Sequence, residues 1–124
     1  MSRPRRSHAD CRYIAAAQAL KCLGGRWKIL IVKKLIDDGP TGFNDLQRAI
    51  PGVSAKMLAQ QLRELQSDRV IARRELVSAP PKTVLYQLSA LGEHARPLVT
   101  ALSDWGQRWI AECGEADRSV REPQ

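Results

Sequence analysis

The chain has 124 residues, which is enough for one compact domain with a core and too few for two ordinary domains and a linker. Its 20 Lys and Arg residues against 13 Asp and Glu residues give a net charge of +7, which favours polyanionic partners but does not determine a fold. No apolar run approaches the roughly 20 residues of a membrane span, and no signal-peptide segment follows the basic opening, so we expect a cytoplasmic protein with no membrane contact.

Three regions are expected along the chain. Residues 1–10 predict a flexible basic arm, residues 11–112 a folded domain, and residues 113–124 a polar tail. The arginines of the arm fit either contact with DNA or plain solvation, and both interpretations stay open.

Three helices are predicted in the first part of the domain. Residues 11–23 are rich in Ala and carry apolar side chains at helical spacing, and Gly24-Gly25 ends this helix. Residues 26–38 are apolar over most of a helical circumference, which predicts the central helix of the domain. Residues 43–50 predict a short helix that ends before Pro51-Gly52.

The stretch PGVSAKMLAQQLREL, residues 51–65, predicts a fourth helix with Ser54 as its N-cap. Its buried stripe is Leu58, Leu62 and Leu65, at positions i, i+4 and i+7. The helical period then turns a second set of residues outward: Ala55, Lys56, Ala59, Gln60 and Arg63.

The second part of the domain changes character. Residues 70–77 and 84–88 are short runs rich in β-branched and aromatic residues, which predicts two antiparallel strands around the proline-stiffened loop SAPPKT. Residues 90–110 predict one final helix with an apolar seam at heptad-like spacing. The seam consists of Leu98, Leu102, Trp105 and Trp109.

The order of these elements predicts the fold class: mainly α with a small antiparallel β-hairpin, a winged helix-turn-helix. In that architecture the fourth helix enters the major groove and the hairpin reaches a neighbouring groove or the backbone. Gln60 suits adenine, Lys56 suits guanine, and small Ala side chains permit close approach. A helix N-terminus with Ser54 suits a phosphate. Taken alone, this face fits the solvated side of a capped amphipathic helix better than a DNA contact, since most such helices bind nothing.

Cations on the hairpin strengthen the prediction of DNA binding. Lys82 lies in the loop after Pro80-Pro81, and Arg73 and Arg74 lie at its base, where they could bind phosphates. The same residues also fit a charged loop that keeps the protein soluble. The combination of basic hairpin and polar fourth helix favours duplex DNA as the partner.

Several motifs then resemble the HxlR family of small bacterial and archaeal winged helix-turn-helix transcription regulators. They are GGRW, FNDLQRAIPGVSAKML, LSALG and the closing DWGQRW, within a similarity that runs from about Ala16 to Trp109. The resemblance implies a homodimer, formed through the first and last helices, on a near-palindromic operator. It implies DNA contacts by Ser54, Ala55, Lys56, Gln60 and Arg63, with Pro81 and Lys82 in the wing.

The resemblance also implies an effector, since family members respond to aldehydes, quinones, oxidants or other small ligands. Many members carry a cysteine where this chain has Ile14, and Cys11 lies nearly a turn away. A thiol response through Cys11 or Cys22 therefore stays a hypothesis. The turn Ser67-Asp68-Arg69 lacks the usual glycine, which predicts a non-glycine residue in a strained conformation.

The apolar seam predicts the dimer interface, because little of the domain is left to cover it, and the alternative is packing wholly within the monomer. We expect Ile14, Leu98, Leu102, Trp105 and Trp109 to lie there. By the resemblance, an effector pocket would lie between the dimerisation helices and the helix-turn-helix, near Tyr13, Ala17, Trp27 and Trp105.

The sequence offers little support for a disulfide-stabilised protein, a metal-binding protein or an enzyme. The cysteines Cys11, Cys22 and Cys113 are scattered and lack CxxC spacing, which argues against a disulfide framework or a zinc site. No catalytic or cofactor-binding fingerprint occurs, so we expect no cofactor and no enzymatic activity. The alternative is a winged helix used as a protein-interaction module without specific DNA binding.

Overall fold

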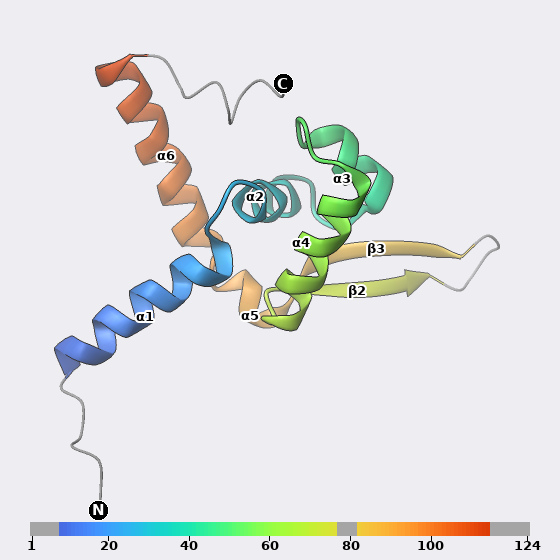
Figure 1. Ribbon diagram of the computed structural model, residues 1–124, viewed down its shortest axis with the longest axis horizontal. Helices are drawn as coiled ribbons and strands as arrows, with labels where there is room; N and C mark the ends of the chain where they lie inside the picture. Colours follow the sequence, from blue (N-terminus) through green and yellow to red (C-terminus); the bar gives the residue numbers. More distant parts are fainter. Residues whose placement is uncertain (1–7, 77–81, 115–124) are drawn as a thin grey trace, which may run out of the picture.

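The computed structural model describes residues 8–76 and 82–114. The helices are α1 (His8–Leu23), α2 (Lys28–Asp38), α3 (Phe43–Ala49), α4 (Ala55–Ser67), α5 (Ala90–Glu93) and α6 (Arg96–Cys113). The strands are β1 (Thr41–Gly42), β2 (Ile71–Leu76) and β3 (Thr83–Leu88). This mostly helical arrangement with a small antiparallel sheet confirms the predicted winged helix-turn-helix (Figure 1).

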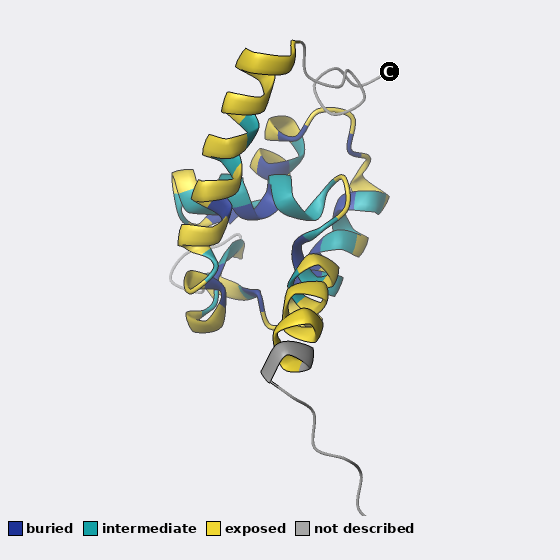
Figure 2. Ribbon diagram, turned by 90° about the vertical axis from the view of Figure 1, so that its left-hand side faces the viewer, coloured by how far each residue is buried: buried dark blue, intermediate teal, exposed yellow. Residues whose placement is uncertain are grey.

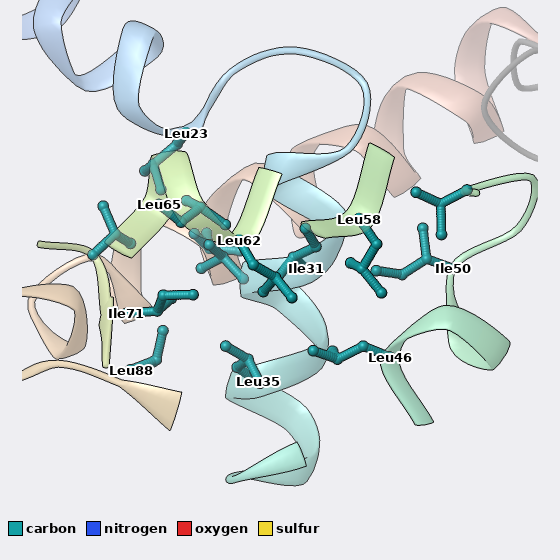
Figure 3. Close-up of a cluster of buried hydrophobic side chains, with 14 residues drawn as sticks. Leu23, Ile31, Leu35, Leu46, Ile50, Leu58, Leu62, Leu65, Ile71 and Leu88 are labelled. Atoms are coloured by element: carbon teal, nitrogen blue, oxygen red, sulfur yellow. The ribbon is translucent and has the colours of Figure 1, made fainter. Parts of the chain in front are cut away.

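Helix α2 lies at the centre of the core, as its apolar sequence predicted. Ile31, Val32 and Leu35 of α2 are almost completely buried. Around them lie leucines of α3 and α4, and the sheet adds Ile71 and Leu88 (Figure 3). One cluster of apolar side chains therefore holds the helices and the sheet together.

Helix α4 forms as expected from its cap and its stripe. The Ser54 side chain accepts a hydrogen bond from the Met57 backbone N–H over 3.0 Å, which satisfies one free donor of the first turn. Leu58, Leu62 and Leu65 are all buried. Burial of these leucines fixes the rotation of α4, so its polar stripe faces solvent.

The sheet has one more strand than the sequence predicted. Its order is β1-β3-β2, with both pairs antiparallel. Strand β1 pairs Thr41 with Tyr86 and Gly42 with Leu85. A strand of only two residues, Thr41 and Gly42, is too short to show an alternating pattern in the sequence. It is part of the sheet because it pairs with β3.

The final helix is not continuous, and the prediction of a single helix over residues 90–110 was wrong. Helix α5 ends at Glu93, and α6 begins at Arg96 with a proline in its first turn. The ring of Pro97 would clash with the carbonyl of residue 93 in an unbroken helix, so the chain turns before it. The Ser89 hydroxyl caps α5 by accepting from the Gly92 N–H over 2.8 Å.

Helix boundaries at the two ends of the domain differ slightly from expectation. Helix α1 begins at His8, inside the region assigned to the basic arm, and α6 ends at Cys113. Both helices reach away from α4 and the sheet (Figure 1). Most of their described surface is exposed (Figure 2).

The turn after α4 contains the strained residue that the sequence predicted. Arg69 has a φ of 63°, in the left-handed region that disfavours side chains. The N–H of Val70 bonds to the Leu65 carbonyl and the N–H of Arg69 to the Gln66 carbonyl, which is the Schellman pattern. The Ser89 hydroxyl donates to the Arg69 carbonyl and so ties this turn to α5.

Replacing Arg69 by glycine should stabilise the domain. The left-handed conformation costs roughly 1–2 kcal/mol for a residue with a side chain. Glycine removes that cost, but its greater backbone freedom in the unfolded chain costs about 0.5–1 kcal/mol, so we expect the free energy of unfolding in urea to rise by up to about 1.5 kcal/mol. Asp68 has an ordinary φ of −82°, so the control Asp68→Gly should lower stability. Equal shifts in both variants would contradict the strain at Arg69.

Candidate nucleic-acid interface

The outer face of α4 displays the side chains that the sequence assigned to DNA. Ser54, Ala55, Lys56, Gln60 and Arg63 are all exposed. Lys56, Gln60 and Arg63 lie on the side of α4 opposite to its buried leucines, and Ser54 and Ala55 are exposed at its N-terminal end. The structure therefore brings the predicted α4 positions together on one solvent-facing stripe.

The start of this stripe combines a cap with an uncompensated cation. Because the Ser54 oxygen accepts from Met57, its own O–H stays available to donate to an anion. Lys56 forms no ion pair with any described residue. This first turn can therefore offer a hydroxyl donor and an ammonium group to a polyanion.

The middle of the stripe contains a network that sequence reasoning missed. Lys28 Nζ lies 2.7 Å from Glu64 Oε1, and Gln60 Nε2 donates to Glu64 Oε2 over 3.1 Å. The hydrogen bond from Lys28, followed by that from Gln60, lowers the pKa of Glu64 from its ordinary value of 4.5. The i, i+4 spacing of Gln60 and Glu64 is a local signal, but the pairing of Lys28 with Glu64 depends on how α2 packs against α4.

The base of the wing contains a second set of charges. Arg73 Nη1 lies 2.9 Å from Glu75 Oε1, and Lys82 Nζ lies 3.5 Å from Glu75 Oε2. The hydrogen bond from Arg73 and then the charge of Lys82 lower the pKa of Glu75. The pKa of Arg73 is raised by Glu75 and then by Tyr86, its cross-strand partner. Two of the predicted phosphate ligands thus share one carboxylate.

Arg74 differs from Arg73 in its surroundings. Neighbouring residues of a strand point to opposite faces, so Arg74 lies on the other side of β2 from Arg73 and Glu75. It is exposed and forms no ion pair among the described residues. Arg74 is therefore the better-available cation of the pair, although the site prediction chose Arg73. Pro81 lies outside the described residues.

Cations without ion pairs are concentrated near α4 and the wing. The lysines of α2 beyond its first turn and the basic residues of α3 and α6 each form an ion pair with a carboxylate. Within residues 11–76 and 82–114, the Lys and Arg side chains outside any ion pair are Arg12, Lys21, Arg26, Lys56, Arg63, Arg69 and Arg74. Four of these seven cations belong to α4, the following turn and β2, and the other three to α1 and the loop after it.

The residues predicted for a dimer interface lie away from this face. Ile14 of α1 and the α6 residues Leu98, Leu102, Trp105 and Trp109 are all exposed, with Trp105 at 64%. Leu20 of α1, which the prediction omitted, is 72% exposed. A single copy of the chain leaves these large apolar side chains in water, and such exposure is typical of an interaction surface.

An apolar pocket of about 460 Å³ opens between α1, the start of α2 and α6. Its lining consists of Ala16, Ala19, Leu20, Leu23, Gly24, Gly25, Ile29, Leu98 and Leu102. None of the residues expected around an effector, Tyr13, Ala17, Trp27 and Trp105, is in this lining. The structure therefore places the apolar cavity beside the predicted location rather than at it.

The three cysteines belong to the two terminal helices, α1 and α6. Cys11 and Cys113 are exposed, near the start of α1 and at the end of α6, and Cys22 is half-buried against the core. In the described part of the chain, His, Cys, Asp and Glu side chains form no group of three that could hold a metal ion. No helix among the described residues is both long and apolar enough to cross a bilayer.

Comparisons with known proteins match this geometry. A family model described as HxlR-like helix-turn-helix matches residues 22–113. The HTH-type transcriptional regulator YdeP of Bacillus subtilis is 38% identical over 90 residues, which cover 73% of this chain and 69% of YdeP.

Solved structures give the same picture. The redox regulator HypR in its reduced form aligns with a TM-score of 0.71 at 32% identity, over 77% of this chain and 92% of that chain. The reduced transcriptional regulator YodB of B. subtilis aligns with a TM-score of 0.62 at 34% identity, over 76% of this chain and 86% of that chain.

Glu75→Gln should strengthen binding to duplex DNA. The variant frees Arg73 and Lys82 from a competing carboxylate, so the slope of log affinity against log salt should steepen by about one to two units. Fluorescence anisotropy over a salt series measures this slope. Glu112→Gln, which removes the partner of Arg108 on α6, makes the same change in net charge far from the wing. Identical slopes for both variants would rule out a wing contact.

Proposed function

This chain belongs to the HxlR-like helix-turn-helix family, and we propose that it is a sequence-specific DNA-binding transcriptional regulator acting as a homodimer on a near-palindromic operator. The observation that carries the proposal is the solvent-facing stripe of α4. It combines polar and small side chains with cations that are not neutralised by described carboxylates. A recognition helix needs these properties to approach base edges between phosphates.

Each residue of the stripe has a chemical role in the proposal. Lys56 can bond to the O6 and N7 acceptors of guanine, and Gln60 can bond bidentately to adenine. Ala55 permits close approach and contact with a thymine methyl. Ser54, at the start of the stripe, and Arg63, at its end, bind phosphates or base edges. In the wing, we assign phosphate contacts to Arg73 and Lys82 and a van der Waals contact with DNA to Pro81, and the exposure of Arg74 adds it to the phosphate ligands.

The apolar surface of α1 and α6 supports the homodimer. Trp105 and Trp109 on α6, together with Ile14 on α1, remain exposed in the monomer. Burying this surface against a second copy would satisfy the hydrophobic effect. Two recognition helices about 34 Å apart would then meet successive major grooves, which explains the near-palindromic operator.

An effector response completes the proposal. Two observations support it: HypR is a redox regulator, and an apolar pocket of about 460 Å³ lies beside the dimerisation helices. A small apolar ligand in this pocket would contact α1, α2 and α6 together. A thiol response would use Cys11, which is exposed, or Cys22, which lies next to the pocket residue Leu23 in the chain.

The DNA-binding proposal is tested with Lys56→Ala and Gln60→Ala. If these residues read bases, each variant should lose roughly 1–3 kcal/mol of specific binding free energy and relax preference at one operator position. Gel shifts at fixed salt, with duplexes selected from a random pool by the wild-type chain, measure both effects. Gln66→Ala, at the other end of α4, should bind like the wild type. Absence of any specific duplex would favour the alternative, a protein-interaction module.

The homodimer is tested with Trp105→Glu. A charge in the middle of the seam should remove at least about 2 kcal/mol of association free energy, which raises the dimer dissociation constant about thirtyfold. Sedimentation velocity across a concentration series measures this constant. Leu91→Glu is the matched control, because Leu91 is 59% exposed but lies on α5, outside the seam. A monomeric wild-type chain would contradict the proposal.

A further inference from the structure

A network of three side chains links the centre of the domain to its DNA face. It consists of Lys28 on α2 and Gln60 and Glu64 on α4. The Lys28 side chain is only 14% exposed, whereas that of Glu64 is 42% exposed. One carboxylate oxygen faces the lysine over 2.7 Å, and the other accepts from Gln60 over 3.1 Å. Glu64 is therefore held from the protein side and itself holds a residue of the solvent-facing stripe.

This contact gives the Gln60 carboxamide a preferred orientation. A glutamine amide has a donor end, Nε2, and an acceptor end, Oε1, and the two can exchange places by rotation of the amide. An ionised carboxylate only accepts hydrogen bonds, so the rotated amide would set Oε1 against a negatively charged oxygen. Glu64 thus keeps Nε2 directed toward itself and leaves Oε1 and the second N–H free.

The groups left free are those that adenine requires. In the major groove adenine presents the N7 acceptor beside the N6 amino donor, and glutamine bonds to both. We propose that Glu64 is a positioning residue for sequence recognition, which orients Gln60 toward adenine before DNA arrives. This inference rests on the proposed function, since only a DNA-reading α4 gives that orientation a purpose.

Lys28 makes the carboxylate tolerable on a surface that meets phosphates. An unpaired carboxylate at this position would repel the DNA backbone, and the ammonium group of Lys28 offsets its charge. The same hydrogen bond keeps the pKa of Glu64 low, so the carboxylate stays ionised and remains an acceptor at neutral pH. The two ends of the network therefore have separate effects, on charge and on orientation.

Glu64→Gln is the direct test. A neutral amide at this position can donate or accept, so it no longer selects one orientation of Gln60. Competition binding with single-base variants of a selected duplex measures preference at each position. The position that Gln60 reads is the one whose preference disappears in Gln60→Ala. At that position we expect Glu64→Gln to lower the ratio of affinities for the preferred base and for the other bases roughly tenfold. The preferences at the other positions should not change.

Two further variants separate the orientation of Gln60 from the net charge of the domain and from the packing of α4 against α2. Asp37→Asn removes a carboxylate from the Lys33 pair on α2, so it matches the charge change of Glu64→Gln without touching α4. It should leave the preference at every position intact. Lys28→Met breaks the tie between α2 and α4 but keeps the carboxylate beside Gln60. It should lower overall affinity and retain discrimination at the Gln60 position.

The outcomes that overturn the proposal are distinct. If Gln60→Ala loses preference at one position while Glu64→Gln keeps it, Glu64 does not position Gln60, and the DNA-binding function stands. If Lys28→Met and Glu64→Gln both lose preference at all positions, Glu64 only holds α4 against α2. If the wild-type chain selects no duplex, the proposed function fails and the inference with it.

Discussion

The apolar contact between α2 and α4 is the constraint on which the rest of the structure depends. Ile31 and Leu35 on α2 meet Leu58 and Leu62 on α4, and all four are at most 2% exposed. Because a helix has a fixed period, burying one stripe of α4 determines which side chains face solvent. The same packing brings Lys28 to Glu64 and thereby sets the surroundings of the polar stripe. The core thus positions the surface that we assign to DNA.

Electrostatics adds a second level of organisation. Carboxylates neutralise lysines and arginines on α2, α3 and α6, often within one helical turn. Along α4 and the base of the wing, several cations have no such partner among the described residues. Two other cations at the base of the wing, Arg73 and Lys82, both pair with the single carboxylate of Glu75. The net charge of +7 is spread over the chain, since Arg12, Lys21 and Arg26 also lie outside ion pairs, and the unpaired cations of α4 and β2 lie where phosphates would be needed. The family relationship and this distribution point to the same partner.

The two terminal helices expose more large apolar side chains than the rest of the described domain. Both α1 and α6 expose large apolar side chains, and the cavity between them is lined by leucines, an isoleucine, alanines and glycines. A soluble monomer seldom leaves so much apolar surface in water. We infer that the second copy and an effector would act on the same region, because Leu98 and Leu102 belong both to the seam and to the cavity. Coupling between ligand and DNA would then pass through α2.

Sequence-based prediction succeeded for features that depend on residues close together along the chain, and it failed for those that depend on residues far apart along it. The helices, the Ser54 cap and the outward face of α4 follow from spacings of three or four residues, and the strain at Arg69 follows from a missing glycine. The break before Arg96 was also signalled locally, by Pro97, but the apolar seam concealed it. By contrast, strand β1 exists only because Thr41 meets Tyr86, which lies far along the chain.

The amino-acid sequence by itself determined the family, the winged helix-turn-helix class and the residues of the α4 stripe, because local periodicity and capping are properties of neighbouring residues. Tertiary structure alone decided that Lys28 pairs with Glu64 and where the apolar cavity opens. These features depend on how elements distant in sequence pack against one another, and no local pattern encodes the distance between two side chains on different helices.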